Sequence, residues 1–103
     1  VRDWLYIDDA VEAIFKILLS PRDFRTFNIG TGVKTSTNQI IEICEEISES
    51  KANIENVSAV SGDAYFAGIS DCSFIEKELN WKFRTDIRTG IEITYQFMKN
   101  KKI

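Results

Sequence analysis

The sequence predicts a small mixed α/β unit that extends over residues 1–103. Two short runs rich in aromatic and β-branched residues alternate with two amphipathic helical patterns, which is typical of α/β layering. No change in composition marks a linker, and the 44% hydrophobic and 28% charged residues are usual for a globular domain. We therefore expect one unit with one core.

The first expected strand covers residues 3–7, and Asp8 or Asp9 then serves as the N-cap of a helix. The two neighbouring carboxylates point apart at a helix start, so capping is favoured over a pair for acid-base chemistry. The helix ends before Pro21 and carries apolar residues at helical spacing on one face: Val11, Ile14, Phe15 and Leu18.

Residues 26–29 are expected to form a second short strand. In the stretch 27–36, FNIGTGVKTS, two glycines follow this strand and precede a helical pattern. Phosphate-binding loops use this order, but no third glycine follows Gly30 and Gly32, and the P-loop Gly-Lys pair is missing. We interpret the glycines as permitting a tight turn with positive φ. Ser36 is expected to cap the next helix in a capping box with Gln39.

The remaining pattern predicts a helix, two weaker strands and two further helices. In order, they are expected at residues 36–48, 54–60, 64–69, 71–79 and 86–99.

The absence of histidine excludes Ser-His and Cys-His catalysis and the usual zinc sites. Cys44 and Cys72 lack metal-like spacing, and Cys44 is expected to be a small core residue on the helix at 36–48. Tyr95 and Lys99 lie one helical turn apart, a spacing that allows a lysine to lower the pKa of a phenol, but so short a motif arises by chance. We therefore expect neither a catalytic residue nor a metal site in this chain.

A net charge of −3 argues against nucleic-acid binding, and the apolar runs are too short for a membrane span or a signal peptide. A cytoplasmic setting follows as the default expectation. The chain begins with Val1, not Met, and opens directly on an expected strand. We hypothesise that it is a piece of a longer protein.

Arg2, at the start of the first strand, is a candidate for binding phosphate through its bidentate guanidinium. From the residues alone, a surface ion pair remains the more frequent interpretation.

Several segments together, in this order, resemble the C-terminal part of an extended short-chain dehydrogenase/reductase of the NAD-dependent nucleotide-sugar epimerase/dehydratase family. They are VRDWLYIDDAVEAI (1–14), FNIGTG (27–32), TSTNQI (35–40), GD (62–63), SD (70–71) and KELNWKFRTDIRTGI (77–91).

The resemblance implies that this chain is the substrate-binding C-terminal portion of a Rossmann-type enzyme. The NAD-binding domain, with its glycine fingerprint and its catalytic tyrosine and lysine, would lie upstream. In such enzymes NAD takes a hydride from the sugar and returns it. The parent protein is thus expected to be an NAD-dependent epimerase or dehydratase, while this chain alone has no catalytic or NAD-binding residue.

The resemblance also assigns roles to single residues. Arg2 matches the arginine that contacts the nucleotide diphosphate of a UDP- or dTDP-linked sugar, which reverses the interpretation from the residues alone. Asp3, Asp9 and Asn28 match positions that orient strand ends and turns, and FNIGTG would lie away from the NAD phosphates.

One departure from the family lies at Val60, where a second phosphate-facing arginine is usual. Either Arg84 or Arg88 substitutes, or the substrate differs, or binding is weak. The tryptophan of RDWLY is typical of dehydratases and the rest of epimerases, so this choice and the identity of the sugar stay open.

The alternative is a stand-alone, non-catalytic module for nucleotide-sugar binding or protein association. If the chain is a piece of such an enzyme, separation from the upstream domain would leave apolar surface exposed, and we expect the chain to form a homo-oligomer.

Overall fold

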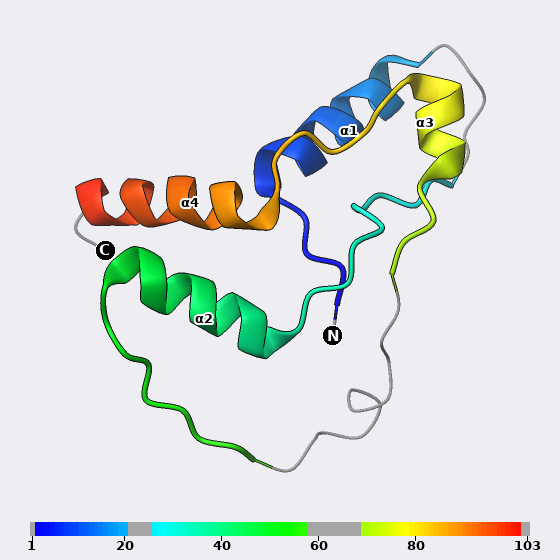
Figure 1. Ribbon diagram of the computed structural model, residues 1–103. Coiled ribbons are helices and arrows are strands. Elements are labelled where there is room, and N and C mark those ends of the chain that lie inside the picture. Colours follow the sequence, from blue (N-terminus) through cyan, green and yellow to red (C-terminus); the bar gives the residue numbers. More distant parts are fainter. Residues whose placement is uncertain (1, 21–25, 58–68, 102–103) are drawn as a thin grey trace.

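The computed structural model describes residues 2–20, 26–57 and 69–101, and within these ranges the chain forms four α-helices (Figure 1). They are α1 (Ile7–Leu19), α2 (Thr37–Ser48), α3 (Ser73–Leu79) and α4 (Ile87–Lys101). The four helices predicted from apolar spacing are therefore confirmed, the last three of them within two residues of their expected bounds.

The strands predicted at 3–7 and 26–29 are wrong in detail, because no strand occurs among the described residues. The two regions are joined instead by an isolated antiparallel bridge between Arg2 and Thr35, with both N–O distances at 3.0 Å. Next to this bridge, the two regions are connected by the Asp3 side chain, which accepts the amides of Thr31 and Gly32. Residues 54–57 and Ile69 are irregular too, and the rest of the two weaker strands lies outside the described residues.

The N-terminus of α1 differs from the prediction, whereas that of α2 agrees with it. Tyr6 is the N-cap of α1 and makes no side-chain cap, which places Asp8 and Asp9 inside the first turn, where carboxylates favour the helix dipole. At α2 the predicted capping box is present: the Gln39 amide donates to Ser36 Oγ at 3.1 Å, and the Ser36 amide donates to Gln39 Oε1 at 2.7 Å.

The core lies between α1, α3 and the loop that joins α3 to α4. Ala13, Ile75 and Trp81 are fully buried there. Around them pack partly buried side chains from Leu5, Ile17, Phe27, Ile29, Cys72, Leu79 and Phe83. The α3–α4 loop runs along α1 in Figure 1, which brings Trp81 against that helix.

The other half of the molecule consists of α2 and α4, which lie side by side (Figure 1). No residue of α2 is buried, and Gly90 is the only buried residue of α4. The prediction of Cys44 as a core residue is wrong, because its side chain is exposed. Among the described helices, α2 packs mainly against α4, and part of its apolar face lines an open groove.

The apolar face of α1 also faces outward. Phe15 and Leu18 are 59% and 72% exposed, while Asp9 and Ala13 on the opposite side are buried. An uncovered stripe of this kind on a helix marks a contact surface more often than a free one.

Among the described helices, none is long and apolar enough to cross a membrane.

Candidate functional site

The Asp3 carboxylate is the hub of the N-terminal region. It accepts the Thr31 amide at 2.9 Å and the Thr31 hydroxyl at 2.6 Å through Oδ1. Its Oδ2 accepts the amides of Gly32 at 2.8 Å and Ser70 at 3.0 Å. One side chain thus joins the N-terminal segment to the glycine turn and to the segment before α3, and the orienting role implied for Asp3 is confirmed.

This arrangement alters the protonation of the groups around it. Burial on its own raises the pKa of Asp3, but the hydrogen bonds from Thr31, Ser70 and Gly32 outweigh it and hold the pKa below its ordinary value of 3.8. Burial raises the pKa of the neighbouring Cys72 thiol, and the charges of Asp3 and Glu76 add to that rise. The raised pKa favours the protonated thiol, which is a poor nucleophile.

The glycine turn has the form of an anion cradle, but its own chain supplies the anion. The amides of Thr31 and Gly32, which a phosphate-binding loop would direct at a ligand, are donated to Asp3. The φ of Gly32 is +76°, as predicted, but the prediction of a positive φ is wrong for Gly30. Glycine is needed at position 30 for space instead, because a Cβ there would come within 2.6 Å of Ser70 Cβ. The turn therefore does not fit the phosphates of NAD.

Arg2, the predicted substrate-binding residue, lies at the exposed edge of this region. Its backbone is fixed by the bridge to Thr35, a residue only 7% exposed. The guanidinium is thus carried by an anchored backbone at the surface, a position from which an arginine can meet a phosphate.

The Asp9 carboxylate forms a second hub, whose partners in the α3–α4 loop were not predicted from the sequence. Its Oδ2 accepts the amides of Arg84 at 3.2 Å and Thr85 at 3.0 Å, while the Asp9 carbonyl accepts Trp81 Nε1 at 3.0 Å. These bonds tie the α3–α4 loop to the start of α1. The orienting role implied for Asp9 is confirmed, whereas Asn28 is exposed and stays a prediction.

The two arginines considered as substitutes for the missing one each form an ion pair at the surface. Arg84 contacts Glu12 of α1 at 3.1 Å, and Arg88 contacts Glu46 of α2 at 2.8 Å. Exposed pairs of this kind contribute little free energy and can be exchanged for a ligand phosphate. Val60 itself lies outside the described residues, so the substitution stays a prediction.

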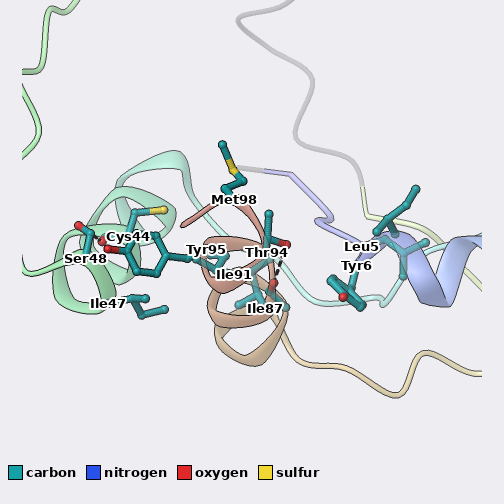
Figure 2. Close-up of a pocket in the computed structure, with 12 residues that line it drawn as sticks. Leu5, Tyr6, Cys44, Ile47, Ser48, Ile87, Ile91, Thr94, Tyr95 and Met98 are labelled. Carbon is teal, nitrogen blue, oxygen red and sulfur yellow. Dashed lines mark hydrogen bonds between the residues drawn. The ribbon is translucent and has the colours of Figure 1, made fainter. Parts of the chain in front are cut away.

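A groove of about 490 Å³ opens between α2, α4 and the Leu5–Ile7 segment. Figure 2 shows Ile47 and Tyr95 among the side chains that line it, with Cys44 and Met98 at its rim. The lining is mostly apolar and contains no charged residue. Because a nucleotide diphosphate needs positive charge, this groove is suited to an apolar cover and not to the phosphates of such a substrate.

Tyr95 and Lys99 contact each other on α4. Lys99 Nζ lies 6.0 Å from the centre of the Tyr95 ring, which is a contact with the face of the ring. Within residues 2–20, 26–57 and 69–101, no three His, Cys, Asp or Glu side chains gather in a way that would hold a metal ion.

Comparison with known proteins gives matches over nearly the whole chain, although no protein-family model matches it. UDP-arabinose 4-epimerase 1 of Arabidopsis thaliana is 32% identical over 102 residues, which are 96% of this chain and 24% of that protein. dTDP-glucose 4,6-dehydratase of Shigella flexneri is 27% identical over 106 residues, with 94% of this chain and 29% of that protein covered.

Two solved structures share the fold. UDP-glucose 4-epimerase of Thermotoga maritima, solved with UDP-glucose, superposes with a TM-score of 0.86 at 26% identity and covers 98% of this chain. An enzyme of Bordetella bronchiseptica, solved with NAD and UDP, superposes with a TM-score of 0.80 at 22% identity and shows the fold alone. This chain spans 32% of either structure.

The predicted α/β class is confirmed by these neighbours, because the chain is a partial unit of Rossmann-type enzymes. The resemblance drawn from the sequence is confirmed as well: over nearly its whole length the chain is similar to nucleotide-sugar 4-epimerases and to a 4,6-dehydratase. It spans only about a quarter to a third of the length of the relatives it matches.

Proposed function

We propose that this chain is the C-terminal, substrate-binding portion of a cytoplasmic, NAD-dependent nucleotide-sugar epimerase or 4,6-dehydratase. The observation that carries the proposal is a match to both kinds of enzyme over 94% or more of the chain, with most of each relative lying outside the match. The substrate is a UDP- or dTDP-linked sugar, because those are the sugars named for the relatives.

Within this proposal, NAD binding and substrate binding are assigned to different parts of the protein. NAD supplies hydride exchange when bound, and its binding site belongs to the part of the protein outside this chain. The residues described here bind and orient the nucleotide end of the substrate. Arg2 contacts the diphosphate, since it is an exposed guanidinium on a fixed backbone, and a guanidinium matches phosphate oxygens in charge and geometry.

The test is Arg2→Ala in the full-length protein, with binding of the UDP- or dTDP-sugar measured by calorimetry. Loss of one charged phosphate contact is expected to weaken binding about ten- to a hundredfold. Arg2→Lys is the matched control, because it keeps the charge without the bidentate fork. Its affinity should lie between those of the wild type and Arg2→Ala. An unchanged affinity in Arg2→Ala would count against the proposed role.

The alternative, a stand-alone and non-catalytic module, predicts a different gene product. An antibody raised against this chain would report the native mass in a lysate of the source cells. The epimerase/dehydratase proposal expects a band roughly three to four times 11.8 kDa, because the chain makes up 24 to 32% of its relatives. A band at 11.8 kDa would favour the alternative.

We further propose that the apolar stripe of α1 is covered by the upstream domain in the whole protein. In the isolated chain, Phe15 and Leu18 remain exposed, and burial of such surface drives association into a homo-oligomer. Sedimentation velocity at increasing concentration should show the isolated chain self-associating. Phe15→Glu with Leu18→Glu should shift it toward monomer, and a strictly monomeric wild-type chain would contradict this proposal.

A further inference from the structure

We propose that Asp3 is a positioning residue for Arg2: its carboxylate holds the glycine turn and the Ser70 segment so that the arginine is presented from a backbone fixed on both sides. The inference rests on the proposed contact between Arg2 and the nucleotide diphosphate. It adds a second residue to that site, one that acts without touching the ligand.

The first support is the number and the reach of the bonds at Asp3. Its two oxygens accept three backbone amides and one hydroxyl, at distances from 2.6 to 3.0 Å. The donors lie on Thr31, Gly32 and Ser70, so the bonds close loops of 28, 29 and 67 residues. A carboxylate bonded in this way has little freedom to rotate, and the backbone at residue 3 is held with it.

The second support is that Arg2 is tied to the same loop. Its amide and carbonyl pair with those of Thr35 at 3.0 Å, while the side chain of Asp3 bonds to Thr31 and Gly32. Residues 2 and 3 therefore contact both ends of the short 31–35 segment. A guanidinium that starts from such a fixed backbone loses less entropy when it binds a phosphate, and this raises affinity without a new contact.

The third support is the fit around the carboxylate. Gly30 is buried, and a Cβ at this position would lie 2.8 Å from Asp3 Oδ2 and 2.6 Å from Ser70 Oγ. The missing side chain lets the turn and the Ser70 segment close on Asp3. The turn is thus shaped around this carboxylate, and the carboxylate in turn sets where residue 2 lies.

The test is a double-mutant cycle in the full-length protein, with UDP and dTDP as probes in calorimetric titrations. The variants are Arg2→Ala, Asp3→Asn and the two combined. Asp3→Asn should weaken binding of the preferred diphosphate by about tenfold in the wild-type background and by less than twofold in the Arg2→Ala background. Coupling of this kind is not expected from a general loss of stability, which would lower affinity in both backgrounds.

Two further variants keep the result interpretable. Asp71→Asn is the matched control, because Asp71 also accepts hydrogen bonds, from the Ser73 amide and hydroxyl, but has no bond to the loop around Arg2; it should leave diphosphate affinity unchanged. If Asp3→Asn does not fold, Thr31→Val removes a single donor to Asp3 and should show the same coupling at smaller size.

The outcomes separate the two proposals. Unchanged affinity in Arg2→Ala would overturn the proposed role of Arg2 itself. A clear loss in Arg2→Ala, with none in Asp3→Asn or with equal losses in both backgrounds, would overturn only the positioning role of Asp3.

Discussion

The two halves of the molecule are held together by different forces. In the half built from α1, α3 and the loop before α4, Trp81 and Ile75 are buried, and the carboxylates of Asp3 and Asp9 bind loop amides. In the half built from α2 and α4, one helix pair packs beside an open apolar groove, and α2 buries no residue at all.

The difference shows which half can sustain its own fold. Buried apolar groups and satisfied polar groups stabilise the first half without outside help. The second half leaves apolar side chains in water, because its groove stays open and α2 buries no residue. The predictions below compare the two halves, from the largest expected effect to the smallest.

Trp81→Ala should be the most destabilising change. The side chain is 1% exposed, and its Nε1 donates to the Asp9 carbonyl at 3.0 Å, so truncation leaves a cavity and removes this hydrogen bond. We expect a loss of about 3–5 kcal/mol in the free energy of unfolding, measured by urea denaturation. Such a loss can unfold a small domain, so Trp81→Phe, which keeps most of the volume, provides a measurable intermediate.

The matched change in the other half is Ile91→Ala. Ile91 lines the groove and is only partly buried, so its truncation should cost about 1–2 kcal/mol. Losses of equal size for Trp81→Ala and Ile91→Ala would contradict the division into a packed and an open half.

Gly30→Ala should be the second most destabilising change after Trp81→Ala, and Gly32→Ala is its control. At Gly30 the new Cβ meets Ser70 and Asp3 at 2.6 to 2.8 Å, so the hydrogen-bonded contacts of Asp3 with the glycine turn and Ser70 must loosen. We expect a cost of about 2–3 kcal/mol in the free energy of unfolding. At Gly32 the nearest atom is 3.7 Å away, and only the φ of +76° opposes alanine, at about 1–2 kcal/mol. Thermal unfolding of the two variants in parallel would measure the order, and a reversed order would show that the turn does not depend on close packing at Gly30.

Local patterns predicted much of this structure because their causes are local. The four helices followed from apolar spacing, and the capping box of Ser36 and Gln39 involves residues three positions apart. The turn at Gly32 needed nothing beyond its own backbone conformation. Each of these features is specified within a few residues of sequence.

The predictions that were wrong concern features that depend on partners far along the chain. Asp9 looks like an N-cap by position, yet its carboxylate accepts amides 75 and 76 residues away. Asp3 likewise accepts the Ser70 amide from 67 residues away. At the candidate site, the role of Arg2 was predicted from the family resemblance. No role was predicted for Thr31, Thr35 or Ser70.

Acid should destabilise the half built from α1, α3 and the loop before α4, because the Asp3 carboxylate there has a lowered pKa. The pKa of Asp3 is held below 3.8 in the folded state, so its bonds stabilise the fold fully above pH 3.8. That stability is lost as pH falls through the folded-state pKa, because the unfolded chain then binds the proton more readily. Urea midpoints measured between pH 5 and pH 2.5 should fall less steeply in Asp3→Asn than in the wild type.

The matched control for acid is Asp86→Asn. The pKa of Asp86 is lowered too, by hydrogen bonds from the Thr89 hydroxyl and amide, but the group is exposed at the start of α4. Its removal should change the acid slope less than removal of Asp3. An equal change would indicate that the hydrogen bonds of Asp3 contribute no more to stability than those of an exposed helix cap.

Ser36→Ala should have the smallest effect, about 1 kcal/mol, because it removes one half of an exposed capping box. Thr37→Ala, one residue further on, is the control and should cost less, since Thr37 is exposed and is not the N-cap. Because α2 buries no side chain, its cap is a larger part of what holds it than a cap would be in a packed helix. Hydrogen exchange should therefore show the loss confined to α2 in Ser36→Ala, and a loss spread equally to α1 would mean that the two halves unfold as one.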